Sequence, residues 1–194
     1  MNKTIDYYNK NAKEYFENTY NADMSEHYDR FLKYLRSNAY ILDAGCGSGR
    51  DSRFFVSLGY SVKPIDASSE LCVLAEKHLG IKVDNIRFED ISYVDEFDGI
   101  WACASLLHVQ KNIINNVISK LYRALKKNGV LYVSFKYGNN EREVNGRYFN
   151  DQNEDSIKLL LKDFEIKELW FSDDVRPGRD DKWINVVAVK KFNL

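Results

Sequence analysis

The stretch "ILDAGCGSGRDS", residues 41–52, places three glycines at alternate positions directly after a short apolar run. Glycine lets the backbone adopt left-handed conformations and approach a ligand closely. The run from Tyr40 to Ala44 predicts a buried strand, and the segment from Arg50 to Leu58 predicts a helix. The glycines therefore lie in a strand-to-helix turn, which is where ligands bind in open α/β sheets.

The spacing of these glycines and the nearby acidic residues narrow the class of ligand. The dinucleotide fingerprint has its third glycine where this chain has Arg50, so a pyrophosphate is disfavoured though still open; the Gly-Lys-Ser/Thr ending of a phosphate-binding loop is missing. Asp43 would repel a pyrophosphate but attract a ligand that carries a positive charge. Asp66 ends the next predicted strand, where a carboxylate can accept both ribose hydroxyls of an adenosine group.

Length and composition bound the class of protein. With 194 residues, 44% hydrophobic and 29% charged, the chain is expected to form one domain, residues 1–194, with a helical cap over 1–38 and an α/β core over 39–194. A net charge of -1 gives no electrostatic reason for a nucleic-acid partner. The cysteines Cys46, Cys72 and Cys103 lack metal-ligand spacing, so no metal is expected. No segment has the apolar pattern of a signal peptide or a membrane span, so the expected location is cytoplasmic, without membrane contact.

Hydrophobic periodicity predicts alternating strands and helices followed by a hairpin. The alternation argues for a parallel sheet with helices on both faces, and the last two strands are expected to pair antiparallel because no helix separates them. Gly59, Gly80 and Gly129 follow predicted helices, at positions where a residue in the left-handed conformation commonly ends a helix. The expected strands are Tyr40 to Ala44, Ser61 to Ile65, Asn85 to Glu89, Gly99 to Cys103, Val130 to Phe135, Phe164 to Phe171 and Trp183 to Val189. The expected helices are Ile5 to Tyr20, Ser25 to Arg36, Arg50 to Leu58, Ser69 to Leu79 and Ile113 to Lys126.

Five segments, in chain order, resemble the motifs of the class I S-adenosylmethionine-dependent methyltransferases: "ILDAGCGSG", "VKPIDAS", "RFEDI", "FDGIWACASLLHV" and "LKKNGVLYVSF". The resemblance is strong from Tyr40 to Phe135. It implies a Rossmann-like α/β fold, a mostly parallel seven-stranded sheet of strand order 3-2-1-4-5-7-6 with an antiparallel C-terminal hairpin, and S-adenosyl-L-methionine as the cofactor. The first motif and the short chain are also similar, more loosely, to the tellurite-resistance type of methyltransferase, which acts on chalcogen oxyanions or small acceptors.

The resemblance also implies which residues contact the cofactor. Asp66 would hold the ribose, Asp90 would accept the adenine amino group, and Cys103 would lie near the transferring methyl. Asp43 would orient either the glycine loop or the ammonium group. The positions expected at the cofactor are Asp43, Gly45, Gly47, Arg50, Asp66, Ala67, Asp90, Ile91, Ala102 and Cys103.

Two residues are candidates for catalysis. His108 follows the fourth predicted strand; it is either a base that faces the substrate or a histidine packed at the end of an element. Tyr15 belongs, with Tyr7, Tyr8 and Tyr20, to an aromatic N-terminal helix that would make a lid over the cofactor, as in many relatives.

Basic residues after the fifth predicted strand and in the terminal hairpin have two interpretations. They are solvated loop charges, or they reach the carboxyl end of the sheet and offer guanidinium groups to an anionic substrate. These residues are Lys136, Arg142, Arg147, Arg176 and Arg179.

Missing motifs narrow the acceptor. The Asn/Asp-Pro-Pro-aromatic motif of amino-directed DNA methyltransferases and the Pro-Cys nucleophile of cytosine-5 enzymes are absent, because the corresponding segment contains "CASLLH". The expected function is therefore methyl transfer to a small acceptor, which is anionic if the arginines bind it. Two alternatives stay open: a methyltransferase for RNA or a protein side chain, and a cofactor-binding protein without turnover.

Overall fold

The computed structural model describes residues 2–191, so residue 1 and residues 192–194 of the expected domain lie outside the described part. The strands are Tyr40–Ala44 (β1), Ser61–Asp66 (β2), Asp84–Asn85 (β3), Phe97–Ala102 (β4), Leu125–Lys136 (β5), Glu141–Val144 (β6), Arg147–Asn150 (β7), Phe164–Asp173 (β8) and Lys182–Lys190 (β9). The helices are Lys3–Lys10 (α1), Ala12–Thr19 (α2), Ser25–Leu32 (α3), Arg50–Ser57 (α4), Ser69–Leu79 (α5), Ile114–Ala124 (α6) and Glu154–Leu160 (α7). Two short 3-10 helices span Phe88–Asp90 (η1) and Leu106–His108 (η2).

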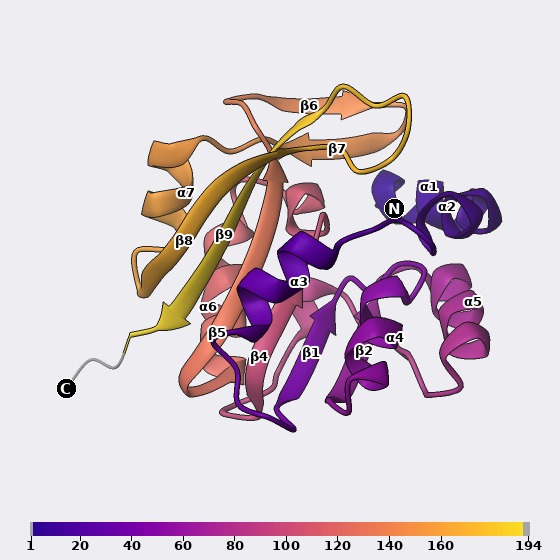
Figure 1. Cartoon of the computed structure of the whole chain (residues 1–194). Coiled ribbons are helices and arrows are strands. Elements are labelled where there is room, and N and C mark those ends of the chain that lie inside the picture. The colour runs from indigo at the N-terminus through magenta and orange to yellow at the C-terminus, as the bar shows by residue number, and fades with distance from the viewer. Residues whose placement is uncertain (1, 192–194) are drawn as a thin grey trace.

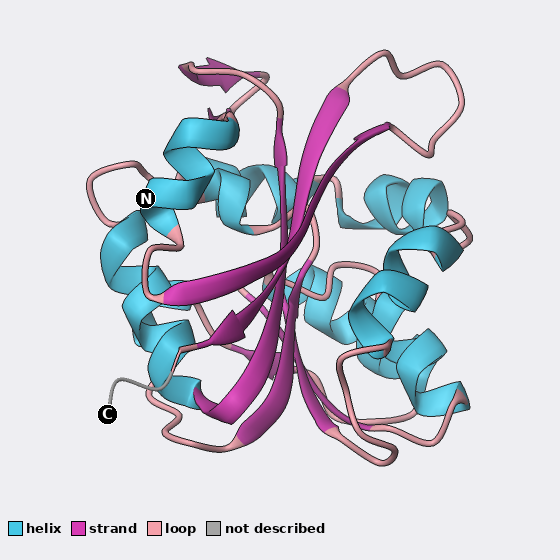
Figure 2. Cartoon of the chain, turned by 60° about the vertical axis from the view of Figure 1, so that its left-hand side comes forward, coloured by secondary structure: helices cyan, strands magenta, loops and turns pink. Residues whose placement is uncertain are grey.

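A seven-stranded sheet of order β3-β2-β1-β4-β5-β9-β8 runs through the middle of the molecule, and helices cover both of its faces (Figure 1, Figure 2). The pairs β1 with β2, β1 with β4, β2 with β3 and β4 with β5 are parallel. Strand β9 pairs antiparallel with both β5 and β8. Because β8 and β9 are the sixth and seventh strands of this sheet along the chain, the strand order is 3-2-1-4-5-7-6. The predicted Rossmann-like fold is confirmed.

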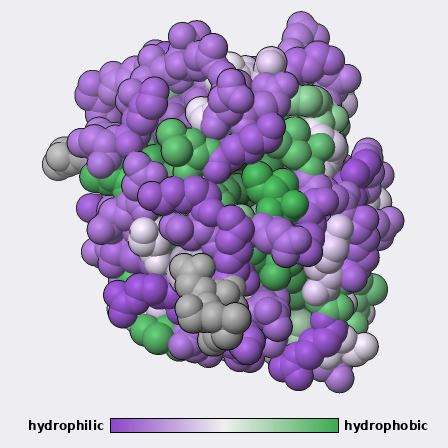
Figure 3. Space-filling model, turned by 90° about the vertical axis from the view of Figure 1, so that its left-hand side faces the viewer, coloured by the Kyte–Doolittle hydropathy of each residue, from purple (hydrophilic) through white to green (hydrophobic). Residues whose placement is uncertain are grey.

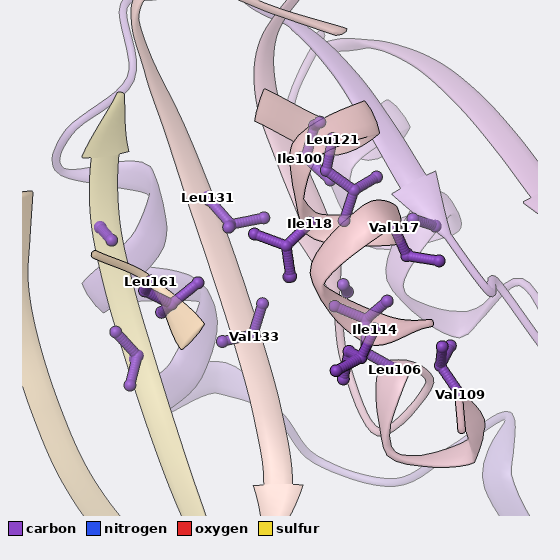
Figure 4. Close-up of a cluster of buried hydrophobic side chains, with 14 of the residues drawn as sticks. Ile100, Leu106, Val109, Ile114, Val117, Ile118, Leu121, Leu131, Val133 and Leu161 are labelled. Atoms are coloured by element: carbon purple, nitrogen blue, oxygen red, sulfur yellow. The ribbon is translucent and has the colours of Figure 1, made fainter. Parts of the chain in front are cut away.

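One face of the sheet is covered by α6. This helix carries apolar residues at spacings of three and four, which places them on a single side. Ile114, Val117, Ile118 and Leu121 are buried there, and Ile118 lies next to Leu131 of β5 (Figure 4). Burying each such side chain stabilises the fold by about 1.5–3 kcal/mol. The packing holds β4 and β5 firmly, and the residues that follow these two strands form part of the site described below.

Aromatic rings fill the opposite face. Trp101 of β4 stacks on Tyr132 of β5 with ring centroids 3.9 Å apart. Phe31 of α3 and Phe55 of α4 pack against the same indole, with ring centroids 5.2 and 5.4 Å from it. Since Phe31 is fully buried, α3 is part of the hydrophobic core that packs on the sheet, and it is not only an element of the predicted helical cap.

Several local predictions were wrong. The predicted helix over residues 5–20 is two helices that meet at Asn11, whose side-chain amide donates to the carbonyl of Tyr7 at 2.8 Å. The predicted strand from Asn85 to Glu89 contains only a short pairing with β2, followed by the 3-10 turn η1. Gly129 does not end a helix, because α6 passes directly into β5 and the left-handed residue beside it is Asn128, with φ 60°.

The segment from Gly138 to Asn150, interpreted from sequence as a charged loop, contains the antiparallel hairpin β6–β7. Its turn residues Asn145 and Gly146 have φ 51° and 77°, the left-handed pair of a two-residue hairpin turn. Helix α7, also not predicted, begins with a capping box between Asn153 and Ser156. In Figure 1 the hairpin lies beyond the carboxyl ends of the parallel strands, on the same side as α1 and α2.

The surface on the side of α7 and β8 is mostly hydrophilic, with separate hydrophobic patches (Figure 3). The exposed large apolar side chains include Leu159 of α7 and Phe171 of β8. Within residues 2–191, none of the helices has both the length and the apolar character needed to cross a bilayer.

Candidate active site

The glycine loop between β1 and α4 has left-handed backbone at each of its three glycines. Gly45, Gly47 and Gly49 have φ of 84°, 55° and 77°. The N–H of Gly47 donates to Oδ2 of Asp66 at 2.9 Å, and the N–H of Ser68 donates to Oδ1 at 2.8 Å. The Asp66 carboxylate therefore connects the loop to the start of α5, and it keeps free lone pairs for a further donor. Burial raises the pKa of Asp66, against the lowering effect of these backbone bonds.

Two cavities open at the carboxyl ends of the parallel strands. The glycine-side cavity is lined by Gly47, Asp66, Ala67, Phe88 and Glu89, among others. The hairpin-side cavity is lined by residues that include Arg50, Cys103, Ser134, Lys136, Arg147 and Arg176. Both cavities share Tyr8, Tyr15, Gly45, Ala104 and His108, so the two spaces meet at these residues. A ligand that extends from one cavity toward the other must pass Tyr8 and His108.

His108, at the end of η2, is held by hydrogen bonds to two different elements. Its Nδ1 donates to the carbonyl oxygen of Tyr148 at 2.7 Å, which assigns the ring proton to Nδ1. Its Nε2 lies 2.8 Å from the phenol oxygen of Tyr8 and accepts the phenol hydrogen. The N–H of Tyr148 in turn donates to the hydroxyl of Thr4 at 3.0 Å, so α1, η2 and β7 are tied together around this histidine.

The surroundings of this pair determine its protonation. Burial lowers the pKa of His108 to about 4, and the positive charges of Arg147 and Lys136 act in the same direction. The imidazole is therefore neutral at neutral pH. Burial raises the pKa of the Tyr8 phenol to about 12, although Arg147 opposes this shift. The nearby ring of Tyr15 is T-shaped to that of Tyr8 at 5.1 Å, and its own pKa is also raised by burial.

The buried carboxylate of Asp51 lies in the wall of the hairpin-side cavity. Asp51, at the start of α4, accepts bonds from Arg50 Nε at 2.6 Å, from the Tyr28 hydroxyl at 2.5 Å and from Trp101 Nε1 at 2.8 Å. Arg50 is thus oriented by a carboxylate while its guanidinium lines the cavity. Asp43 lies behind the loop, where it accepts from Ser52 Oγ at 2.6 Å, and burial together with the charge of Asp51 raises its pKa.

The basic residues of the two late segments differ in their surroundings. Lys136 pairs with Asp181 at 2.8 Å, and Arg176 pairs with Asp174 at 2.6 Å. Arg147 and Arg179 line the same cavity and form no ion pair within residues 2–191. The remaining candidate, Arg142, lies outside both cavities; its guanidinium pairs with Asp151.

Four of the residues expected at the cofactor line neither cavity. Asp90 is exposed, while Ile91 and Ala102 are buried in the apolar core, and neither cavity is lined by any of the three. Asp43 also lies outside both cavities, which fits orientation of the loop better than contact with an ammonium group. The other expected positions line one cavity or both: Gly45, Gly47, Arg50, Asp66, Ala67 and Cys103.

The structure adds residues that sequence reasoning missed. Phe88 and Glu89 occupy the wall that Asp90 and Ile91 were expected to form, because η1 turns the segment after β3. Tyr8 was considered only as one of several lid aromatics, yet its phenol bonds the candidate base. The spacing of Tyr8 and Tyr15 on successive helices was the available signal, but it does not show which ring reaches His108.

The glycine-side cavity fits an adenosine group. It combines a half-buried carboxylate at a strand end, that of Asp66, with apolar walls from Ala67, Leu71, Ile86 and Phe88. The Tyr15 ring packs closely on the glycine loop at the junction of the cavities, where a Cβ added at Gly47 would lie 3.1 Å from it.

Comparisons with known proteins also indicate a methyltransferase. Residues 41–129 match a family described as a methyltransferase domain. An uncharacterized methyltransferase of Staphylococcus carnosus is 23% identical over 197 residues, covering 96% of this chain and 93% of that protein. A malonyl-(acyl-carrier protein) O-methyltransferase of Enterobacter lignolyticus is 35% identical over 101 residues, and that match covers 50% of this chain and only 38% of the relative.

Solved structures share the fold. The 1,6-didemethyltoxoflavin-N1-methyltransferase of Burkholderia thailandensis, with bound 1,6-didemethyltoxoflavin and S-adenosylhomocysteine, has a TM-score of 0.79 at 19% identity and covers 97% of this chain and 85% of its own. TehB from Haemophilus influenzae has a TM-score of 0.72 at 19% identity and covers 93% of this chain and 67% of its own. The matching domain, the methyltransferase relatives and this fold together support a class I S-adenosylmethionine-dependent methyltransferase, with S-adenosylmethionine as the cofactor that this assignment implies.

Proposed function

We propose that this enzyme methylates a small anionic molecule that binds in the hairpin-side cavity. The observation that carries the proposal is Arg147, a cation of that cavity whose Nε is buried and has no hydrogen-bond partner. A buried polar group without a partner is costly, so a cavity that contains one favours a ligand that supplies it. A carboxylate or phosphate group would do so with two parallel hydrogen bonds.

The balance of charge in the cavity supports an anionic ligand. Its wall contains four carboxylates, and each is already paired: Asp51 with Arg50, Asp173 with Lys182, Asp174 with Arg176, and Asp181 with Lys136. Two cations remain after this pairing, Arg147 and the exposed Arg179. The cavity thus has an excess of positive charge that a small anion would neutralise.

Aromatic rings hold the Arg147 guanidinium in place. Its Cζ lies 4.6 Å from the ring centroid of Tyr7 and 5.2 Å from that of Phe149. Such cation–π contacts orient a guanidinium without using its hydrogen-bond donors. The Nε donor of Arg147 is therefore available to a ligand, although the guanidinium also hydrogen-bonds to the Tyr8 phenol, whereas the donors of Arg176 already bind Asp174.

In this proposal, Asp66 accepts the ribose hydroxyls in the glycine-side cavity, with Ala67 and Phe88 beside the adenine. When bound, S-adenosylmethionine supplies a methyl group on a sulfonium sulfur. The chain's own residues align the acceptor and exclude water. Helix α1 and the β6–β7 hairpin serve the second purpose, because the N–H of Tyr148 donates to the Thr4 hydroxyl at 3.0 Å and Lys3 pairs with Glu143 at the surface at 3.0 Å. A roof of this kind supports a small acceptor over a macromolecular one.

Labelled cofactor tests the class of acceptor. Tritiated S-adenosylmethionine and the enzyme are added to a cell extract, which is then separated by size and on an anion exchanger. Label is expected among small molecules that bind the exchanger. Label confined to RNA or protein would contradict the proposal and favour the macromolecular alternative.

Replacement of Arg147 by methionine is expected to weaken acceptor binding selectively. Loss of a charge-assisted pair costs about 1.5–3 kcal/mol, so the rate at limiting acceptor should fall by about 10- to 150-fold. The acceptor fraction from the labelling experiment serves as substrate, and the affinity for S-adenosylhomocysteine should not change. Arg123→Met is the matched control, because Arg123 is an exposed arginine on α6, outside both cavities. Equal effects of both variants would exclude a specific role for Arg147.

A further inference from the structure

We propose that Tyr8 and His108 form a proton relay, in which the acceptor's proton passes to the Tyr8 oxygen while the Tyr8 proton passes to His108 Nε2. The inference rests on the proposed methyl transfer. It adds a class of substrate: the reacting oxygen or nitrogen of the acceptor still carries a proton when it binds.

The hydrogen bonds assign a direction to the relay. The Tyr148 carbonyl can only accept, so His108 Nδ1 carries the ring proton and Nε2 presents a lone pair. Tyr8 donates its single phenol hydrogen to that lone pair at 2.8 Å. The Tyr8 oxygen is then left as an acceptor, at the junction of the two cavities. An incoming O–H or N–H group meets the phenol oxygen, because the His108 lone pair is already occupied.

The groups around His108 keep its imidazole neutral, so Nε2 has a lone pair that can accept a proton, while the charges of Arg147 and Lys136 oppose the positive charge that this proton brings. Phe149 packs on the ring at 5.0 Å, and the charged side chains facing it are Arg147 of β7 and Lys136 of β5. With its lowered pKa of about 4, the imidazole is neutral through the physiological range. Burial raises the pKa of the Tyr8 phenol to about 12, so Tyr8 holds a proton at every stage, and the charge and hydrogen bond of Arg147 offset part of this rise.

The step balances in atoms and charge. The bonding pair of the acceptor's O–H or N–H bond remains on that atom as it forms the new bond to the methyl carbon, and the pair of the sulfur–methyl bond returns to sulfur. The acceptor's proton joins Tyr8, and the former Tyr8 proton joins His108 Nε2. The sulfonium charge disappears as the imidazolium charge appears, so the net charge of the site is unchanged. The imidazolium releases its proton to water when the product leaves.

An acceptor whose reacting atom is already an anion has no proton to pass to the Tyr8 oxygen, so the relay contributes nothing to its methylation. The Arg147 side chain hydrogen-bonds to the same oxygen and lies beside the reacting atom. In the relay, the anionic group of the acceptor binds Arg147, and a separate O–H or N–H group meets Tyr8. A chalcogen oxyanion, in which the charged atom is also the reacting atom, would not use the relay.

The first test needs no turnover. The chain has three histidines, so nitrogen-15 histidine labelling gives few signals, and a His108→Asn variant assigns those of His108. In the complex with S-adenosylhomocysteine, Nδ1 of His108 is expected to be protonated and Nε2 unprotonated from pH 5.5 to 8. Tyr8→Phe should shift the Nε2 signal and leave Nδ1 nearly unchanged. A proton on Nε2 at pH 7 would overturn the relay, even in an enzyme that transfers methyl groups.

The second test separates proton transfer from positioning. The probes are 4-hydroxybenzoate and 4-mercaptobenzoate, which share a carboxylate and differ in the reacting atom; the thiol is already ionised at pH 8. Tyr8→Phe is expected to lower methylation of the hydroxyl by about 100- to 10,000-fold, the usual contribution of general base catalysis. Methylation of the thiolate should change by less than about threefold.

Equal losses of methylation with both probes would make Tyr8 a positioning residue and overturn the relay. Unchanged methylation of both probes would also overturn it. Tyr20→Phe is the matched control, because Tyr20 stacks on Phe16 and lines neither cavity. If neither benzoate is methylated, the nitrogen-15 measurement alone decides.

Discussion

Replacing Gly45 by alanine is expected to abolish tight binding of S-adenosylhomocysteine and to destabilise the fold. Gly45 has φ 84°, and an added Cβ would lie 2.5 Å from the Cβ of Ser105. Ser105 cannot move away easily, because its hydroxyl donates to the carbonyl of Ala44 at 2.7 Å. Left-handed strain costs about 1–2 kcal/mol, and overpacking adds about 1–3 kcal/mol. We expect calorimetry to show at least about 100-fold weaker binding, since the displaced loop carries Gly47 away from Asp66.

The chain provides a matched control for this variant. Gly59 has φ 85°, almost the same conformation as Gly45, but an added Cβ there would meet no atom within 4 Å. Gly59→Ala therefore carries the backbone strain without the clash. It should lose about 1–2 kcal/mol in urea unfolding and keep the cofactor affinity of the wild type. A similar loss of affinity in both variants would show that the clash at the loop does not cause the weaker binding.

Replacing Asp51 by asparagine is expected to cause the largest loss of stability, about 3–5 kcal/mol. Asp51 is only 5% exposed, and its carboxylate is the partner of the Arg50 guanidinium. An amide leaves that cation buried without a counter-charge, and its NH₂ group would face the donors of Tyr28 or Trp101. Asp95→Asn is the control, because the Asp95 carboxylate is 66% exposed in its pair with Lys190, and such surface pairs contribute at most about 1 kcal/mol. Urea unfolding at pH 7 should separate the two variants clearly.

The effect of Asp51 should depend on pH. Burial alone would raise the pKa of Asp51, but the Arg50 pairing and the bonds from Tyr28 and Trp101 hold it below its ordinary value. A carboxyl with a lowered native pKa contributes its stability above the unfolded pKa, about 3.9, and loses it as the pH falls through the native pKa. The difference in unfolding free energy between wild type and Asp51→Asn should therefore be constant near neutral pH and shrink below about pH 4. A difference that grows on acidification would contradict this assignment.

The parts of the site that the sequence predicts best are contiguous in the chain. Gly45 and Gly47 follow β1 directly, so local conformation alone places them in the turn. Asp66 ends β2, and the parallel register that pairs Asp43 with Pro64 brings that strand end beside the loop. A parallel sheet gathers the carboxyl ends of its strands at one edge, which is why these residues could be assigned to one site from pattern and resemblance.

The parts that were missed depend on contacts between distant segments. Tyr8 and His108 are 100 residues apart, and only the packing of α1 against η2 and β7 joins them. The same holds for the arginines: no local pattern shows that Asp151 neutralises Arg142 while Arg147 forms no ion pair within residues 2–191. The β6–β7 hairpin did have a local signal, Asn145-Gly146, which is among the strongest for a hairpin turn. The many charged residues on either side of this turn led to its interpretation as a loop.

The most direct test of the central claim is a crystal structure of the enzyme with S-adenosylhomocysteine. The account predicts that the ribose hydroxyls bind the Asp66 carboxylate in the glycine-side cavity. It also predicts that the sulfur lies at the junction, where Tyr8 and His108 line both cavities. A complex with the adenosine in the hairpin-side cavity, or with the sulfur directed away from Tyr8 and His108, would contradict the account.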